Sequence, residues 1–133
     1  MNQRYALFCD AASKTENGKM ILHGIFDRIY VEKEPTVQEP SVHAMMSFAF
    51  EVEQLDAPQG GEAVVEFVHE SSGTSIFSTK GSFDVTAGAK DKVASVIPLA
   101  MFPLIGIGRY RAKLSINGTE LPGSSFVVEL VKK

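Results

Sequence analysis

Hydrophobic and polar residues alternate most regularly between Val42 and Glu53. Every second residue of this segment is apolar, the set being Val42, Ala44, Met46, Phe48, Phe50 and Val52. Successive side chains of a β-strand point to opposite faces, so a set with a period of two lies on one face. We therefore predict a strand over residues 42–53 with this set in the core. His43, Met45 and Ala49 then face outward.

A second alternating segment covers Arg109–Asn117 and is followed by Gly118. Its apolar set consists of Tyr110, Ala112, Leu114 and Ile116. Asn117-Gly118 is the dipeptide that most readily takes the positive φ values of a tight hairpin turn. We predict that the chain then makes a short excursion at residues 121–123 and returns as a strand over Phe126–Val131. Together these elements form a C-terminal hairpin.

Four further segments are predicted to be strands, which Val, Ile and Phe residues favour. They are residues 5–9, 62–70, 76–85 and 93–102. Gly81 predicts a bulge or bend in the third segment. Pro98 and Pro103 make the fourth an edge strand or a broken strand, because proline donates no hydrogen bond to the ladder. We predict connections or turns at residues 12–18, 32–41, 71–74 and 86–91.

Residues 20–31 are apolar on both faces of a strand and allow three interpretations. One is a central strand covered on two sides, and another is a strand with a bulge at Gly24. The third is a helix, since Ile21, Ile25, Phe26 and Ile29 also fit a helical stripe. The β-branched residues and the internal glycine favour a strand.

These elements predict an all-β fold, an antiparallel immunoglobulin-like β-sandwich of roughly seven to nine strands. The chain has 133 residues and no linker or repeat, so residues 1–133 are expected to form a single domain. Its composition, 44% hydrophobic and 22% charged, is that of an ordinary globular protein.

Three phrases of the sequence carry a resemblance to a known family. They are Ala6-Leu7-Phe8-Cys9-Asp10, the stretch 18–27 that ends in Gly24-Ile25-Phe26-Asp27, and the stretch 108–118 that begins with Gly108-Arg109-Tyr110. In this order the chain resembles a bacterial domain family of unknown function with a short "CD" strand, a "GxFD" strand and a C-terminal "GxY" hairpin. The resemblance spans nearly the whole chain and implies a small sandwich, with no assigned activity.

The phrase Gly108-x-Tyr110 also has a physical interpretation. Many immunoglobulin-like sandwiches place a tyrosine at the start of a late strand, where its hydroxyl bonds the backbone just upstream. We therefore expect a structural role for Tyr110 and Gly108, as for the turn residues Asn117 and Gly118.

Charge and cysteine content narrow the classes of function. The net charge of -3 provides no concentrated cationic surface for nucleic acid. The single cysteine, Cys9, excludes an intramolecular disulfide and favours a reducing compartment. No stretch approaches the roughly 18 apolar residues of a membrane span. We expect a cytoplasmic protein without a nucleic-acid or membrane partner.

Several residue types that carry chemistry are present without a recognisable catalytic or metal-binding pattern. Cys9 follows apolar residues and is interpreted as a small core residue rather than a nucleophile. His23, His43 and His69 lie on different predicted strands without zinc-ligand spacing. Asp10 and Asp27 end strand segments, where turn capping explains them as well as calcium or acid–base chemistry does. We therefore expect no enzyme activity, cofactor or metal.

Two other groups of residues are weighed as contact surfaces. Arg109, Arg111 and Lys113 form a basic stripe that we interpret as a solvated strand face. The segment 101–107 is unusually apolar for a connection, and exposed apolar surface usually marks an interface. A loop folded over the end of the sandwich is the equal alternative. The candidate interface residues are Phe102, Leu104, Ile105, Ile107 and Met45.

The sequence thus predicts a non-enzymatic binding or assembly module that acts through protein–protein contacts, with another protein or with a second copy. The alternative is a small-ligand or ion-binding domain that uses Asp10, Asp27 and the 32–41 loop at one end of the sandwich. A hydrolase or thiol enzyme ranks third, since it requires a cleft that unites Cys9 or a carboxylate with a histidine.

Overall fold

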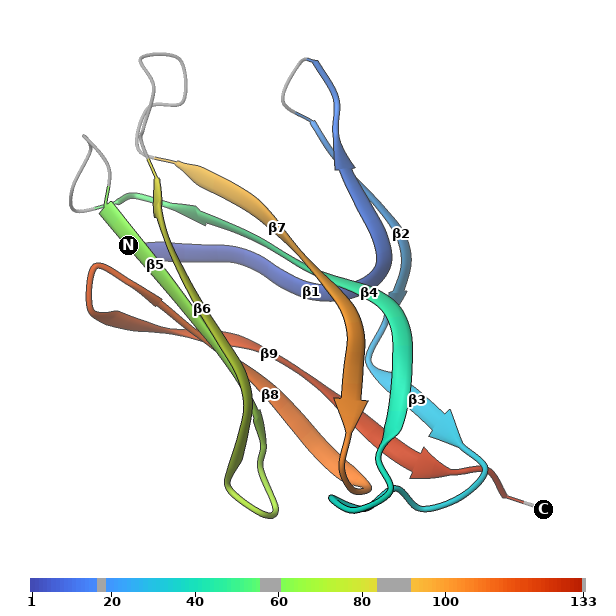
Figure 1. Ribbon diagram of the computed structural model, residues 1–133. Coiled ribbons are helices and arrows are strands. Elements are labelled where there is room, and N and C mark those ends of the chain that lie inside the picture. The colour runs from blue at the N-terminus through green and yellow to red at the C-terminus, as the bar shows by residue number, and fades with distance from the viewer. Residues whose placement is uncertain (17–18, 56–60, 84–91, 133) are drawn as a thin grey trace.

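Nine β-strands make up the computed structural model, which describes residues 1–16, 19–55, 61–83 and 92–132 (Figure 1). Within these ranges the chain contains no helix. The strands are β1 (Asn2–Lys14), β2 (Met20–Phe26), β3 (Arg28–Val31), β4 (Ser41–Glu53), β5 (Gly61–His69), β6 (Thr74–Phe83), β7 (Val93–Leu104), β8 (Gly108–Ile116) and β9 (Thr119–Leu130).

The strands form two sheets that pack as a β-sandwich. The four-stranded sheet has the order β2-β1-β4-β7, and the five-stranded sheet has the order β3-β9-β8-β5-β6. All neighbours are antiparallel except β3 and β9, which run parallel. The predicted all-β sandwich of mainly antiparallel strands is confirmed. The chain crosses from one sheet to the other at Asp27, between β2 and β3 (Figure 1).

Aromatic rings from both sheets fill the space between them. Phe8 of β1 lies 4.8 Å from Phe126 of β9, centroid to centroid and edge to face. Phe48 of β4 meets Phe67 of β5 in the same way at 5.7 Å. Tilted and edge-to-face pairs stabilise a core beyond the area that they bury. The predicted inward positions Met46, Phe48, Phe50 and Val52 all lie in this core.

The first part of β4 departs from the predicted alternation. Val42 and Ala44 are exposed rather than buried, and the half-buried His43 ring lies 6.1 Å from Phe26. Opposite Ala44, the neighbouring strand β7 contains Met101, whose φ of 55° is left-handed. Both strands bend in this region (Figure 1), so the side-chain alternation changes phase although the pairing register continues. The prediction of Val42 and Ala44 as core residues was therefore wrong.

The C-terminal hairpin forms at the predicted dipeptide. Asn117 and Gly118 have φ values of 50° and 81°, the pair of positive angles that a tight hairpin turn needs. The partner strand β9 begins directly at Thr119, so residues 121–123 lie inside the strand rather than before it. Leu121 pairs with Leu114, and Pro122 and Gly123 form a bulge where the register with β8 shifts between Ala112 and Leu114.

Residues 20–31 form two strands rather than one. The edge strand β2 pairs only with β1, so the interpretation as a central covered strand was wrong, as was the helix. Register between β1 and β2 stays continuous past Gly24, so no register shift marks a bulge there. The side chain of Asp10 occupies the space that a Cβ at Gly24 would need.

Other boundaries also differ from the expectations. Strand β1 extends to Lys14, well beyond the predicted 5–9 and into the predicted 12–18 connection. In β6 the register shift lies opposite Phe67 and Val68 rather than at Gly81. Strand β7 is an edge strand, as its prolines predict, and a turn covers residues 70–73. The turn predicted at residues 86–91 lies outside the described residues.

Candidate binding surfaces

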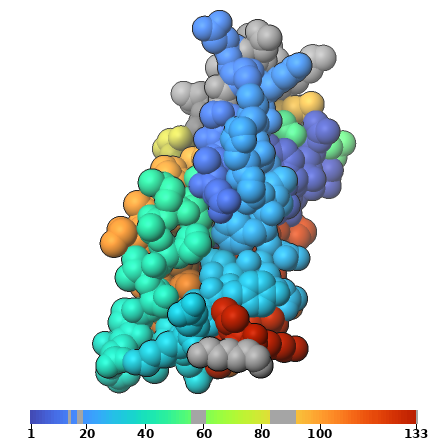
Figure 2. Space-filling view, turned by 90° about the vertical axis from the view of Figure 1, so that its right-hand side faces the viewer, coloured from blue at the N-terminus to red at the C-terminus, as the bar shows by residue number. Residues whose placement is uncertain are grey.

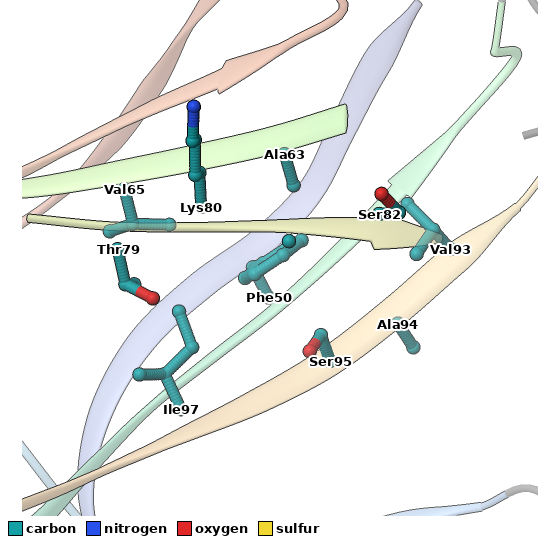
Figure 3. A pocket seen from close by; sticks show the side chains of 11 residues that line it. Phe50, Ala63, Val65, Thr79, Lys80, Ser82, Val93, Ala94, Ser95 and Ile97 are labelled. Carbon is teal, nitrogen blue, oxygen red and sulfur yellow. The ribbon is translucent and has the colours of Figure 1, made fainter. Parts of the chain in front are cut away.

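A cleft lies between β6 and β7, the edge strands of the two sheets. It has a volume of about 300 Å³. Phe50 of β4 and Val65 of β5 form its deep part, while Ile97 of β7 and Thr79 of β6 approach from the two edges (Figure 3). The cleft is also lined by Ala63, Lys80, Gly81, Ser82, Val93, Ala94 and Ser95. The sandwich is thus open along this side.

The chemistry of the cleft is apolar in its depth and polar at few points. Phe50 and Val65 are almost completely buried, and Ile97 is half-buried. Thr79 and Ser95 share the parity of inward residues, because they pair with Val65 and Phe50. Lys80 points to the opposite side of β6 (Figure 3). Within the described residues, neither the Thr79 nor the Ser95 hydroxyl has a side-chain hydrogen bond.

The outer face of the four-stranded sheet is largely apolar, and we call it the apolar face. By register it carries Leu7, Ile25, Met45, Val96, Pro98 and Ala100. Ile25 is 57% exposed and Met45 is 59% exposed, while Cys9, Ser47 and Ala49 between the larger side chains are buried. Figure 2 shows β2 (light blue) and β4 (green) on the surface, with part of β7 (orange) at the edge of the view, and β1 lies between β2 and β4 in the sheet. Among the described residues, no strand packs over this face.

The outer face of the five-stranded sheet is charged in contrast. Glu70 accepts a hydrogen bond of 2.6 Å from Arg111 Nε and lies 3.9 Å from Arg109 Nε. Arg109 also donates to the Ser125 hydroxyl at 2.8 Å. Lys113 pairs in register with Glu66. Because acidic residues accompany the predicted basic stripe, this surface does not present a free row of cations to a phosphate backbone.

The predicted interface segment 101–107 is divided between core and surface. Phe102 is 3% exposed and Leu104 is 1% exposed, so both lie in the core and cannot serve as contact residues without unfolding. Ile105 is half-buried, and Ile107 and Met101 are exposed. The sequence could not separate these roles, because most of the segment belongs to β7 rather than to a loop. Met45 lies on the apolar face.

Tyr110 joins the start of β8 to the preceding connection. Its hydroxyl donates to the Gly106 carbonyl at 2.7 Å and accepts from the Ile105 and Gly106 N–H groups at 2.9 and 3.1 Å. Burial raises the pKa of this hydroxyl, which keeps it protonated as a donor. The ring stacks on Phe126 at 5.1 Å. Tyr110 thus ties the β7–β8 connection to the core.

Cys9 does not have the surroundings of a nucleophile. It is completely buried, and its thiol donates weakly to the Ser47 carbonyl at 3.8 Å. Burial, aided by the charge of Asp10, raises the thiol pKa, so the reactive thiolate is disfavoured. Cys9 packs as a small apolar residue.

The histidines and aspartates do not gather into one site. His69 is buried, with ring nitrogens 2.8 Å from the Ser72 hydroxyl and 2.9 Å from the Ile107 carbonyl. His43 lies beside Phe26, and His23 is exposed on β2. A shallow hollow at residues 30–35 and 39–41 includes neither Asp10 nor Asp27. In the described part of the chain, no three His, Cys, Asp or Glu residues are grouped to hold a metal ion.

Sequence reasoning did not identify the cleft between β6 and β7. Its lining comes from four strands, and their proximity depends on which strands become sheet edges. Gly81 was the one local signal, since it interrupts a strand segment that otherwise carries side chains. The sequence alone predicts a bulge or a bend at Gly81.

Comparison with known proteins identifies a family. Residues 4–129 match the family model described as "Family of unknown function (DUF6941)". Curated proteins gave no match. Among the described residues, no helix is long and apolar enough to cross a membrane.

Proposed function

The chain belongs to this family of unknown function, and we propose that it is a non-enzymatic assembly module whose apolar face binds a second copy of the chain. The observation that carries the proposal is the difference between the two outer faces of the sandwich. One face is charged and carries ion pairs, as expected for a surface in water, and the other exposes Ile25, Met45 and Pro98. Exposed apolar surface of this extent usually marks an interface.

The size of the apolar face suits a dimer. Four strands spaced about 4.8 Å apart give a width of about 19 Å, and the 13 residues of β4 give a length of about 43 Å. The outline is therefore at most about 800 Å², the area that each partner buries in a standard interface. Stacked sheets pack about 10 Å apart, which the small residues Cys9, Ser47 and Ala49 in the middle allow.

The charges at the edge of the apolar face also suit a second copy. Arg4 forms an ion pair with Glu51 at 3.3 Å and approaches Glu53 at 3.9 Å. The rim thus contains both signs of charge, so two identical faces related by a two-fold axis can place opposite charges together. An apolar centre with a polar rim is the usual anatomy of such an interface.

Sedimentation velocity on purified protein tests the proposal. We expect a dimer for the wild type and a monomer for Met45→Glu, because the charge would be buried without a partner. Val127→Glu is the matched control, since Val127 lies on the outer face of β9. It should remain a dimer. A monomeric wild type across the concentration range, or dissociation by both variants alike, would overturn the proposal.

Two finer features belong to the same proposal. We assign the sandwich to the immunoglobulin-like class, supported by the Tyr110 hydroxyl that bonds the backbone upstream of a late strand. We also place the protein in the cytoplasm, supported by a single, buried and unpaired cysteine.

A further inference from the structure

The sandwich has two open sides, and the edge strands are arranged differently at each. On one side the edge strands β2 and β3 follow one another with only Asp27 between them. On the other side β6 and β7 are edges of different sheets and leave the cleft between them. The cleft has a volume of about 300 Å³ and opens beside the core residues Phe50 and Val65.

Gly81 keeps this space open. An added Cβ at Gly81 would meet no heavy atom within 4 Å, so a side chain would fit there. The backbone does not demand glycine either, because the φ of Gly81 is not left-handed and the register with Ala63 is continuous. A glycine inside a strand weakens the strand, and such glycines often mark a site where a ligand approaches the backbone closely.

The volume and lining define what the cleft would take. A water molecule occupies about 30 Å³ of liquid, so the cleft accommodates roughly ten non-hydrogen atoms, at the lower end of ligand sites. Phe50, Val65 and Ile97 offer apolar contact, and the hydroxyls of Thr79 and Ser95 offer hydrogen bonds. Among the described lining residues, Lys80 alone is charged, and its side chain points away from the cleft (Figure 3). A space of this size is too small for a strand of a partner protein.

We propose that this cleft is a binding site for a small neutral amphiphile, an alkyl chain or single aromatic ring with one hydroxyl or carbonyl head. The apolar body lies against Phe50, Val65 and Ile97, and the head exchanges hydrogen bonds with Thr79 and Ser95. The site is separate from the centre of the apolar face, since Ser95 and Ile97 of β7 point inward to it, whereas Val96 and Pro98 of β7 point outward.

Nuclear magnetic resonance titration of the full chain with 1-octanol and 3-phenyl-1-propanol tests the site. Both probes have about the number of non-hydrogen atoms that the volume allows. We expect saturable shifts of backbone amides confined to residues 79–82 and 93–97. Gly81→Leu should fill the cleft and weaken binding at least tenfold.

Ser78→Leu is the matched control, because it adds the same side chain to the outer face of β6. It should bind the probes as the wild type does. Thr79→Val together with Ser95→Ala keeps the shape, removes both hydroxyls and should weaken binding about threefold to tenfold.

Three outcomes would overturn the site. They are no saturable shift up to the solubility of the probes, equal binding by Gly81→Leu, and cleft shifts that follow protein concentration without a probe, which would indicate a second copy as occupant. The Met45→Glu variant should bind the probes unchanged, so the dimer proposal and the ligand site succeed or fail separately.

Discussion

Replacing Tyr110 with phenylalanine isolates one hydroxyl that joins three backbone groups. The Tyr110 hydroxyl donates to the Gly106 carbonyl and accepts from the N–H groups of Ile105 and Gly106. Phenylalanine keeps the ring, so its stacking on Phe126 remains, and the substitution leaves no cavity larger than an oxygen atom. The change therefore measures the hydrogen bonds that fasten the connection between β7 and β8.

The expected loss of stability follows from the number of bonds. Each hydrogen bond contributes about 1 kcal/mol net, and a buried group left without a partner costs somewhat more. Ile105 and Gly106 are half-buried, so water replaces part of the loss. We expect a decrease of about 2–3 kcal/mol in the free energy of unfolding. With an unfolding entropy of about 2.1 cal/mol/K per residue, this lowers the melting temperature of the 133-residue chain by about 9 °C.

Urea unfolding followed by far-ultraviolet circular dichroism measures this change, because the chain has no tryptophan to report by fluorescence. The midpoint should fall with an unchanged dependence on urea, which indicates that the unfolded surface is the same. Tyr30→Phe is the matched control, since Tyr30 is 61% exposed, and its effect should stay below about 0.5 kcal/mol. Equal effects of the two substitutions would refute the structural role of the Tyr110 hydroxyl.

Two further predictions concern alkaline pH and a glycine in β9. Burial raises the pKa values of Cys9 and Tyr110 in the folded state above their unfolded values of about 9 and 10. The stability that these two groups contribute is therefore complete below the unfolded pKa values and is lost as pH rises through the folded pKa values. Unfolding at increasing pH should show this loss, and Cys9→Ala should reduce its earliest part; stability that does not fall would contradict the burial of these groups. Gly123→Ala should cost more than Gly73→Ala, because both glycines have φ near 70° but only the Cβ at Gly123 would lie 2.0 Å from the Ala112 carbonyl oxygen. Equal midpoints in urea would show that the bulge yields without strain.

The sequence predicted correctly those parts of the fold that depend mainly on residues close together in the chain. The predicted inward set Met46, Phe48, Phe50 and Val52 of β4 lies in the core, and β4 is paired with β1 and with β7. The Asn117-Gly118 turn depends on the positive φ of two adjacent residues, which the dipeptide itself supplies. The edge position of β7 follows from its prolines, since a missing N–H is tolerated at an edge.

The remaining features depend on contacts between segments distant in sequence. Val42 and Ala44 were predicted to lie in the core because nothing in the local sequence indicates the bend that exposes them. The bend coincides with Met101 on the paired strand β7, almost sixty residues later, which has a left-handed backbone. For Phe102 and Leu104 the sequence left an exposed interface and a buried position as equal alternatives, because it did not show that β7 continues to Leu104. The cleft could not be predicted from the sequence either, because it depends on β6 and β7 being the edge strands of separate sheets.

Strand β7 connects the two proposed surfaces through the period of two that governs every strand. Ser95 and Ile97 point inward and line the cleft, and Val96 and Pro98 point outward and belong to the apolar face. Because adjacent side chains on a strand point to opposite surfaces, substitutions at adjacent positions of β7 should affect different properties. A change at Ile97 should alter probe binding, and a change at Val96 should alter association. Whether a position of β7 points inward or outward therefore decides which of the two surfaces a substitution in this protein tests.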